Sequence, residues 1–118
     1  MAKTFRDLIV WQESKKLTKH IYEITAAFPK EEIYGLTSQM RKASVSMAAN
    51  IAEGWGNNAS KRQFTQYLNM ANGSLTELEC HIEISHELGF ITEPIKQSSL
   101  AHSRRISYLI NRFRDKLK

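Results

Sequence analysis

The spacing of apolar residues limits what this chain can fold into more than any other feature of its sequence. Between residues 17 and 28 the apolar positions are separated by four, three and four residues, which places them on one face of an α-helix. Stripes of the same kind run through residues 36–51, 64–82 and 106–117. No segment keeps the strict apolar–polar alternation that is typical of a half-buried strand. The sequence therefore predicts an all-α protein with four amphipathic helices.

Local signals mark where these helices begin and end. Thr4 with Asp7 and Ser60 with Gln63 have the spacing of capping boxes, which satisfy free N–H groups at a helix start. A threonine, an acid and a proline at residues 92–94 predict the start of the last helix. The expected helix ends are Pro29 for the first helix, Gly54 and Gly56 for the second, and Gly89 for the third. Short connections between four such helices predict an antiparallel up-and-down four-helix bundle.

Composition agrees with one domain that spans residues 1–118. The chain has 118 residues, of which 42% are hydrophobic and 25% are charged, so it can build one core but not two. The single cysteine, Cys80, excludes an internal disulfide and a cysteine-based zinc site. No apolar run approaches the length of a membrane span, and the N-terminus lacks the apolar stretch of a signal peptide. We therefore expect a cytoplasmic protein.

Small residues concentrate in the second helix, where alanine and serine recur between residues 43 and 52. Gly73 lies inside the third helix, at a cost of about 1 kcal/mol relative to alanine. Because small residues let helix axes approach closely, we predict that the second and third helices form the tightest pair. The aromatic ring of Trp11 either packs partly on the bundle surface or contacts another subunit, and we prefer the contact.

Four polar residues flank the apolar seams of these two helices. Asn50 and Glu53 lie three residues apart on the second helix, and Ser74 and Glu77 take similar positions on the third. A polar group in a bundle seam costs stability unless it is hydrogen-bonded, and it can fix the register or the assembly state. We expect these residues to form hydrogen bonds between helices rather than to bind or to catalyse.

Motifs that indicate enzymes lack their structural context here. Residues 54–59 match the letters of the dinucleotide fingerprint G-x-G-x-x-A, but a helix rather than a strand is expected before them. Glu83 and His86 form one Glu-x-x-His step, whereas a di-iron bundle needs a second such step on another helix. Cys80 lies inside a helix and shows no sign of activation. The sequence therefore predicts no catalytic residue, no metal site and no cofactor.

Positive charge gathers in the last helix. Residues 94–118 contain seven basic groups and one acid, whereas residues 61–93 contain two and five. Helical spacing places four residues on one face, away from the apolar stripe, with Arg104 beside them: Arg105, Tyr108, Arg112 and Lys116. Cations with an aromatic ring suit a phosphate backbone and a stacked base. Alternatively, these cations pair with the acidic stripe of residues 79–87, within or between subunits.

A second cationic group opens the third helix. Lys61 and Arg62 follow the cap residue Ser60, so free N–H groups and two cations could together hold a phosphate oxygen. The alternative is a solvated helix cap. The complete set of predicted nucleic-acid-binding residues is Lys61, Arg62, Arg104, Arg105, Tyr108, Arg112 and Lys116.

Several blocks of the chain resemble proteins encoded in the intervening sequences of bacterial 23S ribosomal RNA genes. The blocks are residues 5–12, from Phe-Arg-Asp-Leu to Trp-Gln, residues 28–36 with Phe-Pro and Tyr-Gly-Leu, residues 38–43, the Asn-Ile-Ala-Glu-Gly run at 50–54, and residues 71–77. The similarity covers nearly the whole chain. One difference is Asn57, at a position where such proteins often carry arginine, and it weakens a phosphate site in that loop.

The resemblance implies a left-handed antiparallel bundle that assembles as a ring, commonly a homopentamer. It also implies kinship with the accessory proteins of diversity-generating retroelements, which are similar basic rings that engage nucleic acid and a reverse transcriptase. No enzymatic activity is implied. Our functional hypothesis is a non-enzymatic, cyclic homo-oligomer, preferably a pentamer, that binds RNA or another nucleic acid through a basic surface. The alternative is a protein–protein scaffold whose charges serve ring assembly.

Overall fold

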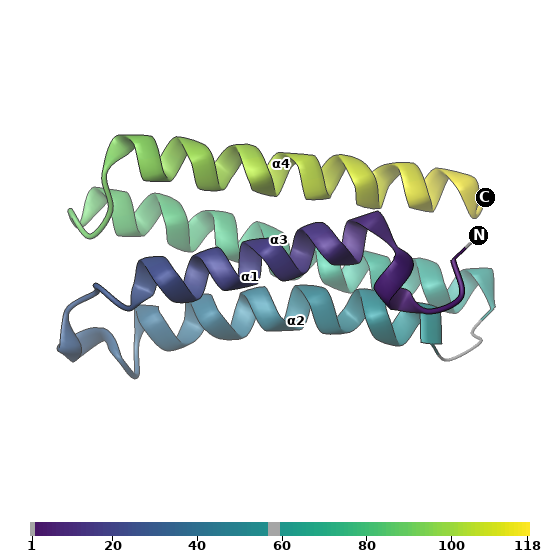
Figure 1. The fold of residues 1–118 in the computed structure, drawn as a ribbon, viewed down its shortest axis with the longest axis horizontal. Helices are drawn as coiled ribbons and strands as arrows, with labels where there is room; N and C mark the ends of the chain where they lie inside the picture. The colour runs from purple at the N-terminus through teal and green to yellow at the C-terminus, as the bar shows by residue number, and fades with distance from the viewer. Residues whose placement is uncertain (1, 57–59) are drawn as a thin grey trace.

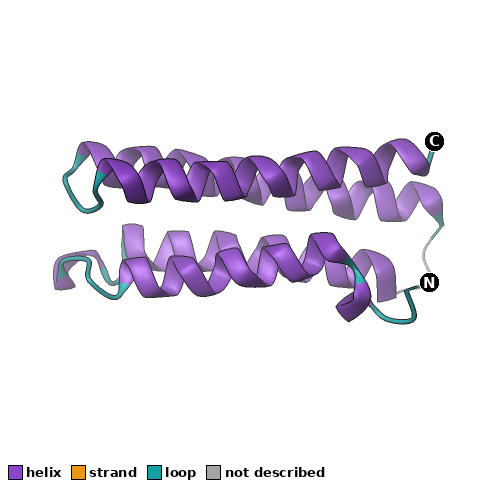
Figure 2. Cartoon of the chain, turned by 45° about the horizontal axis from the view of Figure 1, so that its top comes forward, coloured by secondary structure: helices purple, strands orange, loops and turns teal. Residues whose placement is uncertain are grey.

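The chain folds into four antiparallel α-helices that pack side by side (Figure 1). The computed structural model describes residues 2–56 and 60–118. The helices are α1 (Ile9–Thr25), α2 (Leu36–Gly56), α3 (Lys61–Glu87) and α4 (Glu93–Lys116), and two short 3-10 helices, η1 (Phe5–Asp7) and η2 (Lys30–Glu32), precede α1 and α2. No strand occurs in the part of the chain that the structure describes (Figure 2). The prediction of an all-α four-helix bundle is confirmed.

The bundle is elongated, measuring 43 × 24 × 20 Å. The start of η1 and the C-terminus lie at the same end of its long axis, where α2 ends and α3 begins (Figure 1). No described helix combines the length and the apolar character that a membrane span requires.

The predicted apolar stripes form the core between the helices. Each stripe contributes large side chains that are at most 1% exposed: Leu17, Ile21, Met40, Met47, Ile51, Leu68, Leu75, Leu78, Ile82, Ile106 and Ile110. Burying a side chain of this size stabilises the fold by about 1.5–3 kcal/mol. The four helices are therefore held together mainly by this shared core.

Most of the predicted helix boundaries are confirmed. The hydroxyl of Ser60 accepts a hydrogen bond from the N–H of Gln63, and the Gln63 side chain accepts one from the N–H of Ser60, so the capping box of α3 is complete. The hydroxyl of Thr92 caps α4. Gly89 follows α3 with a φ of +80°, a conformation that favours glycine.

The first helix differs from the prediction at both ends. The capping box of Thr4 and Asp7 is present, but it caps η1 rather than α1. Leu8 then takes an extended backbone conformation, with φ −76° and ψ 125°, which lets its side chain reach the core, and α1 begins at Ile9. At the other end α1 stops at Thr25, four residues before Pro29. The apolar stripe continues past the helix, because Phe28 stays buried and its ring packs against that of Phe90, with the ring centres 5.3 Å apart.

Gly54 does not end the second helix as the sequence suggested. It lies within α2, which continues to Gly56. A Cβ atom at Gly54 would lie 2.8 Å from Cδ1 of Phe64 and 2.8 Å from Cβ of Tyr67. Glycine is needed there because α3 approaches α2 too closely for any side chain, not because the helix must stop.

The close contact between α2 and α3 agrees with the predicted packing of these two helices, but Gly73 has no part in it. The hydroxyl groups of Ser46 and Ser74 lie 3.1 Å apart across this seam. A Cβ atom at Gly73 would meet no other atom within 4 Å. Nothing in the protomer explains why this position of α3 is a glycine.

Candidate nucleic-acid interface

Charge is divided unequally along the long axis of the bundle. The half that contains the chain ends comprises residues 2–16, 48–56, 60–72 and 103–118, with twelve Lys and Arg against four Asp and Glu, a net charge of +8. The other half comprises residues 17–47 and 73–102, with five basic and eight acidic residues, a net charge of −3. The antiparallel fold thus brings basic residues from distant parts of the sequence to one end of the molecule.

The cationic face of α4 lies within this basic half and is open to solvent. Arg105, Tyr108, Arg112 and Lys116 are all exposed, and Tyr108 retains 56% of its accessible surface. The guanidinium of Arg112 donates a hydrogen bond of 3.0 Å to the hydroxyl of Tyr108 and lies 5.8 Å from its ring centre. This hydrogen bond, together with the Coulomb interaction with Tyr108, raises the pKa of Arg112. The pair therefore presents a permanent cation beside an exposed aromatic ring.

Arg105 is partly engaged by a carboxylate of α1. Its Nε lies 3.5 Å from Oε1 of Glu13, and Nε2 of His102 lies 3.1 Å from the same oxygen. Nζ of Lys16 lies 3.3 Å from the second oxygen, Oε2. The Arg105 side chain is nevertheless 57% exposed, so it can still meet an anion. The alternative partners that the sequence offered for this cation were the acids of the third helix, and Glu13 of α1 was not among them.

Three basic side chains around Glu13 influence its pKa. Burial acts to raise the pKa of Glu13, but the hydrogen bond from Lys16 and the positive charges of Lys16, His102 and Arg105 outweigh it and lower the pKa. A carboxylate with a lowered pKa in the folded state stabilises the protein above its unfolded pKa, and this stabilisation is lost as the pH falls through the folded pKa.

Replacing Glu13 by glutamine tests this cluster. We expect Glu13→Gln to be less stable than the wild type by about 1 kcal/mol at pH 7, since exposed or half-exposed ion pairs contribute roughly that much together. The difference should shrink as the pH is lowered below 4.5, the ordinary pKa of glutamate, because the wild-type carboxylate becomes protonated there. Thermal unfolding of both proteins at pH 7 and pH 3 measures it. An equal difference at both pH values would contradict this role for Glu13.

Lys61 and Arg62 lie apart from this face, on the other side of α4. They border a depression of about 770 Å³ between the start of α3 and the end of α4. Two further cations border it, Arg114 and Lys118. Neither was among the predicted site residues. Arg114 donates a hydrogen bond of 2.5 Å to Asn69 and another to Asn111, which holds its guanidinium at the edge of the depression. The contact depends on which side chains of α3 and α4 face each other across their seam, which the residue spacing within one helix does not reveal.

A second depression adjoins the cationic face of α4. It measures about 300 Å³ and separates η1 and the start of α1 from the end of α4. Its apolar lining includes Leu109 and Phe113, and Arg112 and Lys116 stand at its border. Asp7 borders it too, and hydrogen bonds from the N–H groups of Lys3 and Thr4 lower the pKa of this carboxyl. An apolar hollow beside two cations can accept a flat ring while the cations meet its charged substituents.

The seven predicted residues therefore fall into three places. Arg105, Tyr108, Arg112 and Lys116 share the outer face of α4, and Lys61 and Arg62 share the depression at its other side. Arg104 is exposed near the middle of α4 and joins neither group. The fold brings both groups to the same basic half of the bundle but not into one continuous cleft.

Two acidic residues of α3 contact α4, but neither contacts its cationic face. Glu83 lies 3.2 Å from Lys96, and Glu79 accepts a hydrogen bond of 2.6 Å from Ser103. His86 lies 2.8 Å from Glu93, so the two members of the Glu-x-x-His step each pair with α4. Among the residues that the structure describes, no three His, Cys, Asp or Glu side chains are grouped as metal ligands.

The polar residues beside the α2–α3 seam divide into two pairs. The amide of Asn50 donates to the carbonyl of Ser46 at 2.9 Å and to its hydroxyl at 3.3 Å, and that hydroxyl meets Ser74. This network joins the two helices as expected. Glu53 and Glu77 are exposed and take no part in it, so the expected interhelix hydrogen bonds do not extend to them.

Two other expectations concern Trp11 and Asn57. Trp11 is half-buried, with its ring centre 4.9 Å from that of Phe5 and Nζ of Lys15 5.0 Å from the ring, so much of its surface is covered within the protomer. Asn57 lies outside the described residues.

Comparisons with known proteins agree with this architecture. The profile of a family described as "23S rRNA-intervening sequence protein" matches residues 6–112. A crystal structure from Bacteroides thetaiotaomicron, described as a protein of unknown function from the S23 ribosomal protein family, superposes with a TM-score of 0.79. It is 22% identical to this chain, and the match covers 90% of this chain and 98% of that one, which supports the fold. A search of curated proteins gives no match.

Proposed function

Because the chain belongs to the 23S rRNA-intervening sequence protein family, we propose that it is a non-enzymatic, homo-oligomeric protein that binds single-stranded RNA with the basic half of its bundle. The observation that carries this proposal is the separation of charge along the axis, +8 at one end and −3 at the other. A concentrated positive field on one end attracts a polyanion, whereas the same net charge spread evenly would not guide it to one surface.

The geometry of the cationic face of α4 suits unpaired bases. Arg112 and Lys116 would contact phosphates, because both are exposed and border the apolar depression beside α4. A base that is not held in a duplex can enter such a depression or stack on the ring of Tyr108. Lys61 and Arg62 would hold further phosphates on the other side of α4. The chain's own side chains thus supply both backbone contacts and stacking surfaces.

Assembly is part of the proposal, with a cyclic pentamer as the preferred form. In a ring whose helices run along the symmetry axis, every basic half faces the same way, so the positive charge of all copies is gathered on one face. A basic ring of this kind agrees with the kinship to accessory proteins of diversity-generating retroelements that the sequence resemblance implies. If that kinship holds, the expected protein partner is a reverse transcriptase. We place the assembly in the cytoplasm, where RNA is accessible.

Salt dependence tests RNA binding directly. The probe is a fluorescently labelled 20-nucleotide single-stranded RNA of mixed sequence, followed by anisotropy between 50 and 200 mM salt. With about four phosphate contacts the affinity should fall on the order of fiftyfold over this range, because bound counterions are released at each contact. The same sequence as a duplex should compete more weakly. Affinity that stays constant over this range would overturn the proposal.

The scaffold alternative is favoured by one observation. Glu77 and Glu87 on α3 form no ion pair with any described residue, and Arg105 already has a carboxylate partner. If the charges serve assembly alone, the protein should form oligomers and bind none of the RNA probe at 50 mM salt. RNA binding by an intact oligomer distinguishes the two functions.

A further inference from the structure

A groove runs along the side of the bundle that α1 and α2 form. It consists of two depressions that meet at Val45. The first measures about 550 Å³ and is bordered by Tyr22 and Ile33, and the second measures about 410 Å³ and is bordered by Lys19 and Ala49. No carboxylate is among the described residues that line them. We call this surface the α1–α2 groove.

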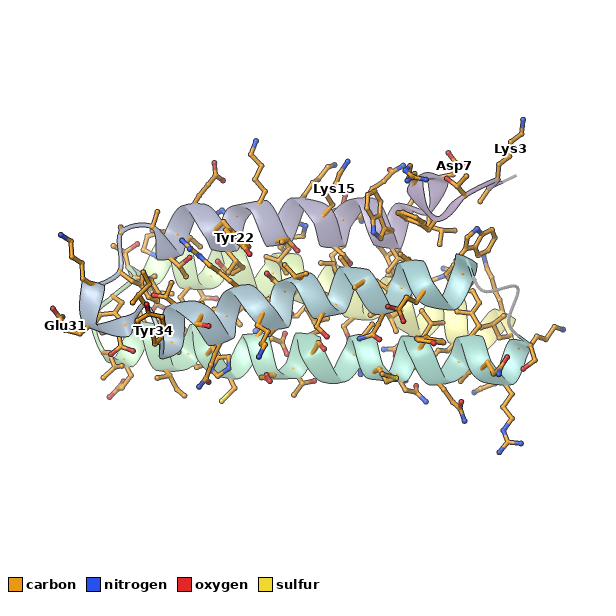
Figure 3. All side chains as sticks on the ribbon, turned by 90° about the horizontal axis from the view of Figure 1, so that it is seen from below. Lys3, Asp7, Lys15, Tyr22, Glu31 and Tyr34 are labelled. Carbon is orange, nitrogen blue, oxygen red and sulfur yellow. The ribbon has the colours of Figure 1, made fainter. Side chains whose placement is uncertain are left out.

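The groove combines exposed apolar surface with a cationic rim. Tyr22, Ile33 and Val45 retain 42%, 55% and 46% of their accessible surface. Lys15 and Lys19 of α1 border the groove, and Figure 3 shows Lys15 and Tyr22 on α1, which lies above α2 in that view. On α2, Arg41 and Lys42 border the groove.

The rim is held in position before anything binds. Nε of Arg41 donates a hydrogen bond of 2.9 Å to the hydroxyl of Thr25, and its guanidinium lies 4.7 Å from the ring centre of Tyr22. Because these contacts fix a cation and an aromatic ring of the groove, little conformational freedom is left to lose on binding.

The outer side of α3 carries a complementary surface. Met70, Glu77, Ile84 and Leu88 follow one another at intervals of seven, seven and four residues, so they form one stripe along the helix. Met70, Ile84 and Leu88 are 55%, 43% and 55% exposed. The neighbouring Glu87 is exposed as well, and neither it nor Glu77 has an ion-pair partner among the described residues. We call these residues the α3 stripe.

We propose that the α1–α2 groove of one copy of this chain binds the α3 stripe of a second copy. Both surfaces expose apolar side chains of similar size, which would be removed from water together. The rim of the groove is basic and the unpaired charges of the stripe are acidic, so the two surfaces attract each other. Contacts between two grooves or between two stripes would bring like charges together and are disfavoured. This inference rests on the proposed oligomer and identifies the two faces that build it.

The two surfaces of one protomer cannot meet each other. Met70 and Glu77 lie four residues before and three residues after Ser74, whose hydroxyl contacts Ser46 of α2, so the stripe borders the α2–α3 seam on its outer side. Figure 3 shows α2 in front, with α1 above it and α3 below it. The groove and the stripe therefore lie on adjacent sides of the bundle that share α2 as their edge.

The position of the two surfaces on adjacent sides also predicts what kind of oligomer the contact builds. Two different surfaces that bind each other head to tail generate a closed ring when the rotation between copies closes. Neighbouring sides of a four-helix bundle face directions about 90° apart. In a closed ring, the two contact surfaces of each copy must face directions about 90° apart for four copies and about 108° apart for five. The geometry therefore favours a small ring with helices along its axis, rather than a two-fold dimer.

The lengths of the two surfaces are compatible. On α2 the lining of the groove runs from Thr37 to Ala49, about 18 Å, and the stripe runs from Met70 to Leu88, about 27 Å, so the stripe can follow the whole groove.

Mixing two defective variants tests the pairing of groove and stripe. Val45→Asp/Ala49→Asp places acids in the groove, and Met70→Lys/Ile84→Lys places cations on the stripe. Because all four positions are on the protein surface, each variant should fold, which circular dichroism checks. By light scattering, each variant alone should have the mass of one 13.6 kDa chain. An equimolar mixture should have at least twice that mass, because the intact groove of one variant meets the intact stripe of the other, and the remaining acidic groove faces a cationic stripe.

Ile9→Asp is the matched control, since Ile9 is 58% exposed but belongs to neither surface, and it should keep the wild-type mass. A mixture that stays at the mass of one chain, or variants that keep the wild-type mass, would overturn the assignment of these faces while leaving the oligomer in place. A wild-type protein with the mass of one chain would contradict the proposed oligomer itself. The salt titration with RNA tests RNA binding separately, whatever the mass of the protein.

Discussion

Reversing the charge of Arg112 and Lys116 together is expected to weaken binding of the single-stranded RNA probe on the order of a hundredfold at 0.1 M salt. Each phosphate contact to a single strand releases about 0.7 of a counterion, which corresponds to about fivefold in affinity at this salt concentration. Arg112→Glu/Lys116→Glu removes two such contacts and also adds two repulsive charges beside the apolar depression. The slope of log affinity against log salt should become shallower at the same time.

Lys30→Glu is the matched control for the single variant Arg112→Glu. It makes the same two-unit change in charge, but Lys30 is an exposed residue of η2 in the acidic half of the bundle. Arg112→Glu should weaken binding about tenfold or more and Lys30→Glu less than threefold. The Arg112 side chain bonds only the exposed Tyr108 among the described residues, so folding should be unaffected. Equal losses for both single variants would show that RNA responds to net charge and that no surface is selected.

The four helices could be predicted from the sequence because the signals that specify them are local. Apolar spacing and the capping residues Ser60 and Thr92 act within one or two helical turns, and both caps form as expected. Gly54 was misread for the same reason. A glycine near the end of an apolar stripe looks like a helix stop, and only the position of Phe64 on α3 shows that it permits a close approach.

The candidate site was predictable only where it lies on one helix. The cationic face of α4 follows from spacing alone, and its residues are exposed. Arg105 pairs with Glu13, and Lys61 lies beside Arg114 and Lys118, because of the way the side chains of different helices face each other across the seams. Spacing along one helix does not specify this. The separation of charge along the axis has the same origin, because it appears only when basic segments from both termini are folded to one end.

Gly54→Ala is the substitution with the largest expected effect on stability. The added Cβ would lie 2.8 Å from Cδ1 of Phe64 and from Cβ of Tyr67. The Phe64 ring can turn aside, but the Cβ of Tyr67 is attached directly to the α3 backbone, so the two helices must separate. Overpacking of this kind costs about 1–3 kcal/mol or more, and alanine recovers at most about 1 kcal/mol of helix propensity. We expect a net loss of about 2 kcal/mol and a midpoint of thermal unfolding lower by roughly 10 °C.

Gly56→Ala separates this packing effect from the general effect of replacing a helical glycine. Gly56 is the last residue of the same helix, its φ is not positive, and a Cβ there meets no atom within 4 Å. Its substitution should change the free energy of unfolding by less than about 0.5 kcal/mol. If both variants unfold at the same temperature, α2 and α3 are not in close contact at Gly54. A shorter residue in place of Phe64 should not restore the stability of Gly54→Ala, because the contact with the Tyr67 Cβ remains.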